Sequence, residues 1–242
     1  MGENWSGRRG SNPRLPPWQG GALPLSYARI SRLSGRSILD LGQKSGHISH
    51  VACALQVGLK VKNKMTHLIE KVNNSNDFGP VQQALFALLD QQGIFSETWA
   101  HPPIFTVQEG EELKLHEHIP GQGGKSLLLK NKASELWLVV ACDSTRVDLK
   151  GLSDRLQTKR FSFASPEIML EVLGVTPGSA TPFALMNDKE HKINVVVDKN
   201  FLDHEECVFH PLENRWSTVI KVADLLEFLK NLGYQPHVLE LS

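Results

Sequence analysis

The stretch Leu127-Leu-Leu-Lys-Asn-Lys-Ala-Ser-Glu-Leu-Trp-Leu-Val-Val-Ala-Cys142 decides how this sequence folds. Two apolar runs of strand length, residues 127–129 and 136–142, flank a polar turn that starts at Asn131. The second run has seven residues, far fewer than the roughly 20 needed to span a membrane. The stretch therefore predicts two neighbouring strands in the core of a globular domain, and we expect no membrane partner.

Helix signals lie on both sides of these strands. Apolar side chains share one helical face from Val81 to Leu89, ahead of Gly93, and again from Val222 to Leu229. Ser165-Pro-Glu is typical of a helix start, and Gly174 of its end. Further strands are expected at residues 104–107, 193–198, 207–210 and 217–220. Because strands and helices do not alternate regularly, we predict one mixed α/β (α+β) domain over residues 78–242 instead of a doubly wound parallel sheet.

Charge divides the 242-residue chain into two parts. Residues 1–64 hold ten Lys or Arg and two acidic residues, so the remaining 16 basic and 24 acidic residues lie in 65–242. The larger part is therefore not a general polyanion binder, and we expect no DNA partner. The three cysteines form no CxxC pair, which excludes a cysteine-built zinc site and suits the reducing cytoplasm.

Residues 1–64 are rich in Gly, Pro, Ser and Arg, a composition that buries too little apolar surface to fold. We interpret them as a disordered basic extension outside the fold. A mitochondrial or other organellar transit peptide is a second interpretation, because the segment is rich in Arg and poor in acids. A third is that the functional protein begins at Met65.

One lysine motif resembles a phosphate-binding loop, and one histidine pair resembles a metal site. In neither case does the residue spacing support that kind of site. Gly124-Lys125-Ser126 lacks the first glycine and the following helix of a phosphate-binding loop, so a nucleoside triphosphate site is rejected. Lys125 still follows Pro120-Gly-Gln-Gly-Gly, a sequence predicted to be a flexible hinge ahead of a strand. His116 and His118 would share one face of a strand, but no third ligand stands at metal spacing.

Three other features each have a structural and a functional interpretation. His210 ends a predicted strand, where a histidine is more often a hydrogen-bonded core residue than a catalyst. Asp143 and Asp148 could form a carboxylate pair or simply make a turn. The loop from Gly174 to Pro182 is rigid, and its backbone N–H groups could stabilise an oxyanion, or it could be a structural turn.

Five motifs occur in a fixed order and together resemble one family. They are His101-Pro-Pro-Ile-Phe-Thr-Val, Gly124-Lys-Ser-Leu-Leu-Leu-Lys130, Phe161-Ser-Phe-Ala-Ser-Pro-Glu167, Gly174-Val-Thr-Pro-Gly-Ser-Ala-Thr-Pro-Phe-Ala-Leu185 and Phe209-His-Pro-Leu212. In this order they resemble the YbaK/ProX family of aminoacyl-tRNA deacylases, and most closely its freestanding, alanine-specific branch. The resemblance covers residues 78–242.

The resemblance implies a mixed, mostly antiparallel, barrel-like sheet with flanking helices. It implies a trans-editing enzyme that hydrolyses alanine from the acceptor end of tRNA(Pro), with prolyl-tRNA synthetase as a further partner and without a metal or other cofactor. The residues it assigns are Lys125 and His210 as catalytic, and Ser126, Gly178, Ser179, Ala180, Thr181, Pro182, His101 and Pro102 as substrate-binding. Ser126 departs from the family pattern, which commonly has asparagine there.

The chemistry of the expected reaction agrees with these residues. An aminoacyl ester is already activated, so a positioned water and oxyanion stabilisation suffice for hydrolysis. A pocket built for proline also admits the smaller alanine, which explains the need for a second site with a small pocket. Two alternatives remain: an inactive tRNA- or synthetase-binding module of the same fold, indicated by Ser126, or RNA binding by residues 1–64.

Overall fold

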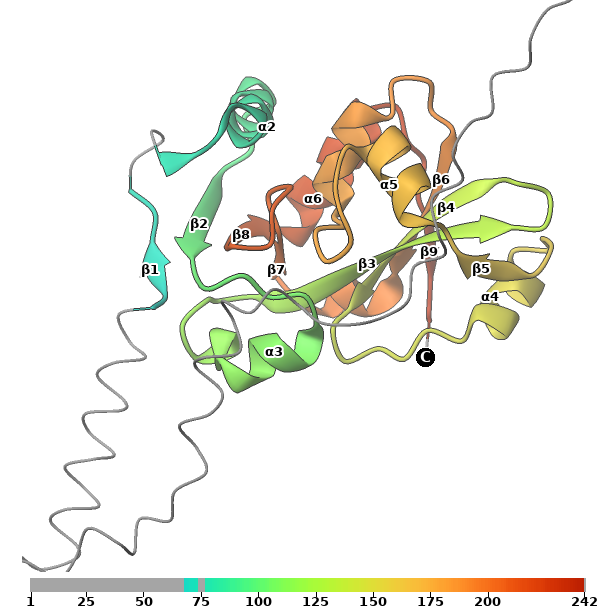
Figure 1. Ribbon diagram of the computed structural model, residues 1–242, viewed down its shortest axis with the longest axis horizontal. Helices are drawn as coiled ribbons and strands as arrows, with labels where there is room; N and C mark the ends of the chain where they lie inside the picture. The colour runs from blue at the N-terminus through green and yellow to red at the C-terminus, as the bar shows by residue number, and fades with distance from the viewer. Residues whose placement is uncertain (1–67, 74–76, 242) are drawn as a thin grey trace, which may run out of the picture. The chain divides into compact units, whose positions relative to one another are not determined.

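The computed structural model describes residues 68–73 and 77–241, which belong to one compact unit of the chain. The basic extension predicted for residues 1–64 lies outside the described residues. Figure 1 shows strands in the centre and helices around them. No helix in the described ranges is both long and apolar enough to cross a membrane.

The strands and helices follow one another without a repeating unit. The strands are β1 (Glu70–Lys71), β2 (Ser96–Ala100), β3 (Gln122–Asn131), β4 (Leu136–Cys142), β5 (Phe161–Phe163), β6 (Ile193–Asp198), β7 (Glu206–Phe209), β8 (Trp216–Lys221) and β9 (His237–Leu239). The α-helices are α2 (Pro80–Gln91), α3 (Val107–Glu112), α4 (Leu149–Arg155), α5 (Pro166–Leu173) and α6 (Val222–Asn231). Three 3-10 helices complete the described chain: η3 (Leu115–Glu117), η4 (Pro182–Asn187) and η5 (Lys199–Asp203).

The strands form one mixed sheet with the order β1-β2-β8-β7-β3-β4-β6-β9, and β5 also pairs with β3. Five of the pairings are antiparallel, while β3 with β7, β4 with β6, and β6 with β9 are parallel. The predicted mixed, mostly antiparallel sheet with flanking helices is therefore confirmed. The central pair is β3 and β4, the two strands predicted from residues 127–142.

Both faces of the central strands are buried, which explains the uninterrupted apolar run at residues 136–142. Because side chains alternate along a strand, Leu138 and Val140 of β4 lie on one face and Val139 and Ala141 on the other. The first face packs in one cluster with residues of α2, α5 and α6. The second packs with Leu152 of α4 and its neighbours. The sheet is thus the middle layer of the domain.

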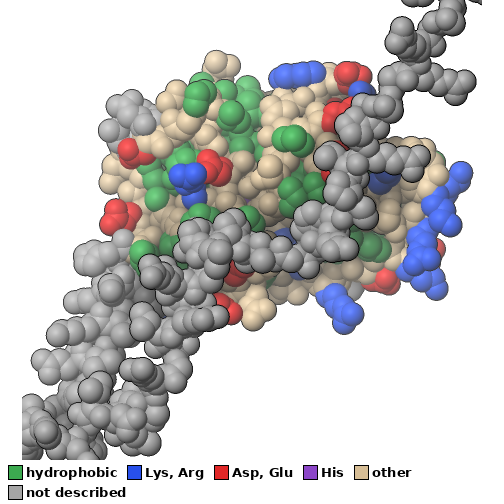
Figure 2. All heavy atoms as spheres, in the orientation of Figure 1, with side chains coloured by type: hydrophobic (Ala, Val, Ile, Leu, Met, Phe, Trp, Pro, Cys, Tyr) green, Lys and Arg blue, Asp and Glu red, His purple; other side chains and the backbone are tan. Residues whose placement is uncertain are grey.

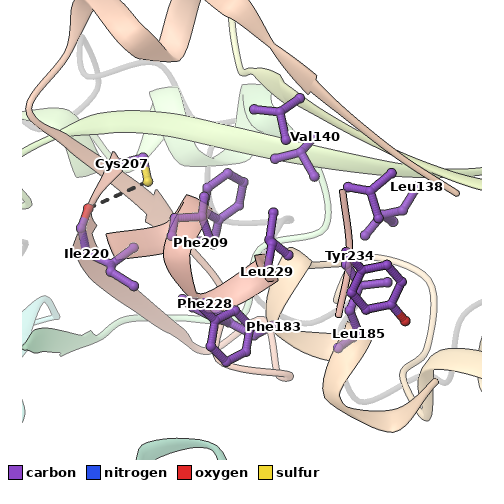
Figure 3. Packing of buried hydrophobic residues seen from close by; sticks show 14 of the residues in the cluster. Leu138, Val140, Phe183, Leu185, Cys207, Phe209, Ile220, Phe228, Leu229 and Tyr234 are labelled. Carbon is purple, nitrogen blue, oxygen red and sulfur yellow. Dashed lines mark hydrogen bonds between the residues drawn. The ribbon is translucent and has the colours of Figure 1, made fainter. Parts of the chain in front are cut away.

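Phenylalanines fill the space between the sheet and α6 (Figure 3). Phe183, at the start of η4, is fully buried and meets Phe228 of α6 edge-on, with 5.7 Å between the ring centroids. It also meets Phe209 of β7 edge-on at 6.5 Å. Because Phe183 follows Pro182 directly, this packing anchors one end of the Gly174–Pro182 loop in the core.

Several local predictions are confirmed, and one strand prediction is wrong. Ser165 caps α5, since its hydroxyl accepts a hydrogen bond from the Ile168 N–H, and Gly174 ends the helix with a left-handed φ of 67°. The strand predicted at residues 104–107 is absent from the described structure. The strand is Ser96–Ala100 instead, because this segment pairs with five residues of β8. Thr106 caps α3, accepting from the Glu109 N–H at 3.2 Å.

Candidate functional site

The candidate site lies at a gap along one edge of β3. On its other edge, β3 pairs with β4 from Gly124 to Lys130. On the gap side, β7 pairs only with Gln122 and Gly123, and β5 only with residues 129–131. The two strands therefore leave the middle of this edge of β3 without a neighbouring strand in the described structure.

Ladder geometry shows which backbone groups face the gap. The Asp143 N–H donates to the Gly123 oxygen at 2.9 Å, and the Asn131 N–H donates to the Glu135 oxygen at 3.0 Å. Odd-numbered residues of β3 therefore direct their N–H and C=O groups towards β4, because these directions alternate along a strand. The N–H and C=O of Ser126 consequently point into the gap, where a ligand can reach them.

A cavity of about 430 Å³ opens beside this gap. It is of the size that proteins use for small ligands. Its walls come from β3, from residues 104–119, from residues 177–180 and from the end of β7. Of the predicted site residues, it is lined by Lys125, Ser126, Gly178, Ala180 and His210. Segments more than 80 residues apart in the sequence thus meet at one cavity.

Lys125 is held by the turn that follows β4. Its Nζ donates to the backbone oxygen of Asp143 at 2.7 Å. An ammonium has three N–H donors, so two remain for a ligand in the cavity. The Asp143 carboxylate is fixed in turn, because Oδ1 accepts from Gln122 Nε2 at 2.8 Å and from the Ser144 N–H at 2.7 Å. Asp143 also lines the cavity.

Two glycines of β3 make this arrangement possible. The sequence predicted a hinge at residues 120–124, but Gly123 and Gly124 lie inside β3, and Lys125 is therefore not at the start of a strand. A Cβ on Gly123 would overlap the Asp143 carboxylate, and a Cβ on Gly124 would overlap the ring of Phe209. Both glycines thus serve close packing in a strand, not flexibility.

His210 follows β7 directly, and its ring is neutral. Nδ1 lies 2.7 Å from the backbone oxygen of Trp216. A carbonyl oxygen only accepts, so Nδ1 carries the proton and Nε2 is left as an acceptor. Burial lowers the pKa of His210 from 6.5 to about 4, against a smaller raising effect of the Trp216 hydrogen bond. At neutral pH, His210 therefore offers the cavity an uncharged acceptor.

His101 lies behind the cavity wall and does not line it. Its Nδ1 is 2.8 Å from the backbone oxygen of Pro102 and its Nε2 is 2.9 Å from Ser217 Oγ. The Pro102 carbonyl requires a proton on Nδ1, so Nε2 accepts the Ser217 hydroxyl proton. Burial lowers the pKa of His101 too. Ser217 does line the cavity, so His101 is joined to the cavity wall through that hydroxyl. The substrate-binding roles of His101 and Pro102 remain predictions.

Ser126 carries a hydroxyl without a partner. Its Oγ is buried and makes no hydrogen bond within the described residues. Buried hydroxyls are almost always hydrogen-bonded, since leaving one unpaired costs about 1–3 kcal/mol. This unpaired hydroxyl belongs to a residue that lines the cavity.

The loop from Gly174 to Pro182 forms the opposite wall. Gly178 has a φ of 90°, and a Cβ there would lie 2.8 Å from the ring of Phe105. The loop has fewer free backbone N–H groups than predicted, because the Ser179 N–H donates to the Thr176 oxygen at 3.0 Å. The buried Ser179, Thr181 and Pro182 do not line the cavity. Only Gly178 and Ala180 of the predicted loop residues do.

Sequence reasoning missed the aromatic rim of the cavity. Phe105 and Phe163 both line it, yet their side chains are 64% and 65% exposed. Phe105 precedes α3 and Phe163 ends β5, so the two rings come from separate elements. Each stands in a family-like motif, which is the signal that could have identified them. Exposed phenyl rings beside a cavity offer flat apolar faces for stacking.

The histidines considered for metal binding are not on a strand. His116 lies in η3 and His118 directly follows it, so the assumed strand geometry is wrong. His116 lines the cavity and His118 does not. Asp148 caps α4 by accepting from the Lys150 N–H at 3.0 Å and forms no pair with Asp143. Within residues 68–73 and 77–241, no three His, Cys, Asp or Glu side chains are grouped as metal ligands.

Comparison with known proteins identifies relatives of this chain. A model of the aminoacyl-tRNA editing domain matches residues 101–228. The "Prolyl-tRNA editing protein ProX" of Acetoanaerobium sticklandii is 31% identical over 163 residues, which are 66% of this chain and 97% of that protein. "Prolyl-tRNA synthetase associated domain-containing protein 1" of Bos taurus is 36% identical over 168 residues, 67% of this chain and 94% of that protein.

A solved structure shows the same fold. The crystal structure of a candidate trans-editing enzyme for prolyl tRNA synthetase superposes with a TM-score of 0.53 at 18% identity, and covers 68% of this chain and 99% of that one. The family model and the editing relative ProX define the class of protein: an enzyme that removes the amino acid from aminoacyl-tRNA. The chain belongs to the aminoacyl-tRNA editing domain family.

Proposed function

We propose that this enzyme hydrolyses the ester between alanine and tRNA(Pro), and so clears alanine attached to the wrong tRNA. The observation that carries the proposal is the single cavity in which Lys125, His210 and the small residues Gly178 and Ala180 meet. Family membership supports the reaction. Relatives named for prolyl-tRNA editing and for prolyl-tRNA synthetase support the choice of tRNA.

Two side chains of the cavity have separate roles in ester hydrolysis. Water bonded to the Nε2 acceptor of His210 attacks the ester carbonyl carbon, and the bond from that carbon to the ribose oxygen breaks. The free N–H donors of Lys125 stabilise the negative charge that develops on the carbonyl oxygen. One proton from water passes to the ribose oxygen, so the products are alanine and tRNA with a free terminal hydroxyl.

The opposite wall supports selection by size. Gly178 and Ala180 carry the least side-chain bulk possible, and the Phe105 ring packs directly on Gly178. The Thr181 cap and the buried Phe183 hold the loop, so it cannot easily withdraw to admit a larger ring. Alanine then fits where proline does not. Such a sieve complements a synthetase pocket, which rejects a smaller side chain by only about 1–3 kcal/mol.

The rim and the nearby surface suit a nucleic acid end. Bases stack on aromatic rings for about 1–3 kcal/mol each, and Phe105 and Phe163 present such rings at the rim. Figure 2 shows Lys and Arg side chains gathered at the edge that carries the β3–β4 turn, α4 and β5. Exposed basic residues on these segments include Lys132 and Lys159, while Lys130 is half-buried. The rest of the face seen in Figure 2 carries both charges.

The test is the release of labelled alanine from Ala-tRNA(Pro) by the purified full chain, beside Pro-tRNA(Pro) and Cys-tRNA(Pro). The proposal expects rapid release of alanine and little release of proline. A folded sample that hydrolyses none of the three esters, at enzyme concentrations far above those of the tRNA, would contradict it.

Ala180→Met tests the size-selecting wall. A long side chain at this position fills part of the cavity, so we expect release of alanine to fall at least about tenfold. The measurement is kcat/KM for Ala-tRNA(Pro), with Leu170→Met on the exposed face of α5 as the control. Unchanged turnover in Ala180→Met would show that this wall does not set the pocket size.

A further inference from the structure

We propose that the carboxylate of Asp143 binds the α-ammonium group of the aminoacyl ester, and that the enzyme thereby selects esters of amino acids over other acyl groups. This inference rests on the proposed function, because it assigns a role within the same cavity. It gives a function to a residue for which the sequence allowed either a carboxylate pair or a turn.

The first step is that the cavity holds two opposite charges that do not form an ion pair with each other. Lys125 Nζ contacts the backbone oxygen of Asp143, not its carboxylate. The ion pairs among the described residues all lie elsewhere. An unpaired cation and an unpaired anion therefore line the same cavity. Lys125 lies on β3, and Asp143 lies in the turn after β4, the strand that pairs with β3.

The second step is that the Asp143 carboxylate is held with one oxygen free. Oδ1 accepts from Gln122 Nε2 and from the Ser144 N–H. Oδ2 accepts no hydrogen bond within the described structure and lies over Gly123, in the space that a Cβ would need. The absence of a side chain on Gly123 thus leaves Oδ2 at the cavity with its lone pairs available.

The third step is the fit to the ligand. In an aminoacyl ester, a positively charged amine stands one carbon away from the carbonyl carbon that water attacks. A cavity that receives this group must offer an acceptor, because an unpaired charge in a partly buried site is costly. Lys125 serves the carbonyl oxygen, and Asp143 Oδ2 serves the ammonium. The cavity thus offers a cation to the carbonyl oxygen and an anion to the amine of the same ester.

The experiment compares two esters on one tRNA. Ala-tRNA(Pro) is treated with nitrous acid to give lactyl-tRNA(Pro), which carries a hydroxyl in place of the amine and is otherwise the same. Each kcat/KM is divided by the rate of spontaneous hydrolysis of that ester, since the ammonium itself activates the ester. The enzymes are the full chain, Asp143→Asn, and Asp154→Asn as the control. Asp154 is an exposed carboxylate on α4 that does not line the cavity.

Asp143→Asn is a conservative change, because the amide oxygen can replace Oδ1 and the backbone oxygen that holds Lys125 is untouched. We expect the unaltered chain to prefer the alanyl ester by about ten- to a hundredfold, as for a hydrogen bond between charged groups. Asp143→Asn should lose that preference by slowing on the alanyl ester alone. Asp154→Asn should keep it.

Three results would overturn the inference. Equal loss on both esters would show that Asp143 only positions Lys125 or supports the fold. No loss on either ester would show that Oδ2 does not contact the substrate. A missing preference in the unaltered chain would reject ammonium recognition even if Asp143→Asn failed to fold. Hydrolysis of neither ester by the unaltered chain would instead reject the proposed function, and the inference with it.

Discussion

The two edges of β3 differ in almost every respect. Along one edge, β4 pairs with seven consecutive residues, and most apolar side chains of both strands are buried. Along the other, β7 and β5 each pair with two or three residues and leave a gap between them. The paired edge carries the core, while the gapped edge carries the cavity, the unpaired Ser126 hydroxyl and a free acceptor on His210.

This difference shows how one strand can serve both stability and chemistry. Lys125 and the other odd-numbered residues of β3 bond to β4, so this pairing restricts movement of the backbone around Ser126 when a ligand enters from the gap. The gap leaves polar groups without protein partners, and those groups are what a substrate can use. Changes on the paired edge should therefore reduce stability, and changes on the gapped edge should reduce activity.

The largest effect is expected from Lys125→Ala on the gapped edge. Removing a donor that stabilises an oxyanion lowers kcat by about 100- to 1000-fold. The fold should persist, because Lys125 contributes one hydrogen bond to a turn. The measurement is alanine release together with a thermal unfolding curve, and Lys199→Ala, an exposed position of η5, is the control. Full activity in Lys125→Ala would disprove the assigned role.

Leu138→Ala on the paired edge should show the opposite pattern. Leu138 is fully buried in the main core cluster. Truncating a buried leucine leaves a cavity and costs about 3 kcal/mol of unfolding free energy. Urea unfolding measures this loss, and alanine release at low temperature should be unchanged per folded molecule. A selective loss of activity without a loss of stability would show that the two edges are not separate in function.

His210 makes stability depend on pH. Burial holds its pKa at about 4 in the folded chain, against 6.5 when unfolded, so the unfolded chain binds the proton first. The free energy of unfolding is therefore unaffected by this histidine above pH 6.5. It falls by up to about 3 kcal/mol as the pH falls towards 4. The check is the unfolding free energy of the unaltered chain and of His210→Asn at several pH values. Parallel curves for the two proteins would contradict the shifted pKa.

The smallest effect is expected from Ser126→Ala. The Ser126 Oγ has no partner in the described structure, so its removal should leave stability unchanged or raise it slightly. If the hydroxyl bonds the substrate, kcat/KM should fall by several-fold, about the worth of one neutral hydrogen bond. Thermal unfolding and alanine release measure the two effects. Ser126→Asn, which restores the residue common in the family, should keep most of the activity.

Sequence patterns predicted the parts of this fold that are set locally. β6 covers the predicted residues 193–198, and Ser165 and Gly174 bound α5 as expected, because caps and apolar periodicity act within a few residues. The strand predicted at residues 104–107 was wrong, because pairing with distant β8 selected an earlier segment. The six-residue helix α3 buries no side chain and so gives no periodic signal.

The candidate site was predictable to a similar degree. Resemblance predicted Lys125, His210 and the Gly178–Pro182 loop as site residues, and the structure brings Lys125 and His210 to one cavity. Local sequence could not show that Gly123 is a strand residue that leaves room for the Asp143 carboxylate, because Asp143 is 20 positions away. Nor could it show that Ser179 faces away from the cavity, since this depends on how the loop turns.

The short parallel contact between β3 and β7 has a consequence for the synthesis of the protein. Gln122 and Gly123 meet Cys207 and Val208, so the cavity needs residues made early and residues made late. Pairing over such a separation forms slowly, and it cannot begin before β7 has been made. A growing chain is itself joined to tRNA by an ester, and many aminoacyl-tRNAs surround it. Until residues 208–217 have been made, the unfinished protein lacks the part of its site that carries His210 and Ser217.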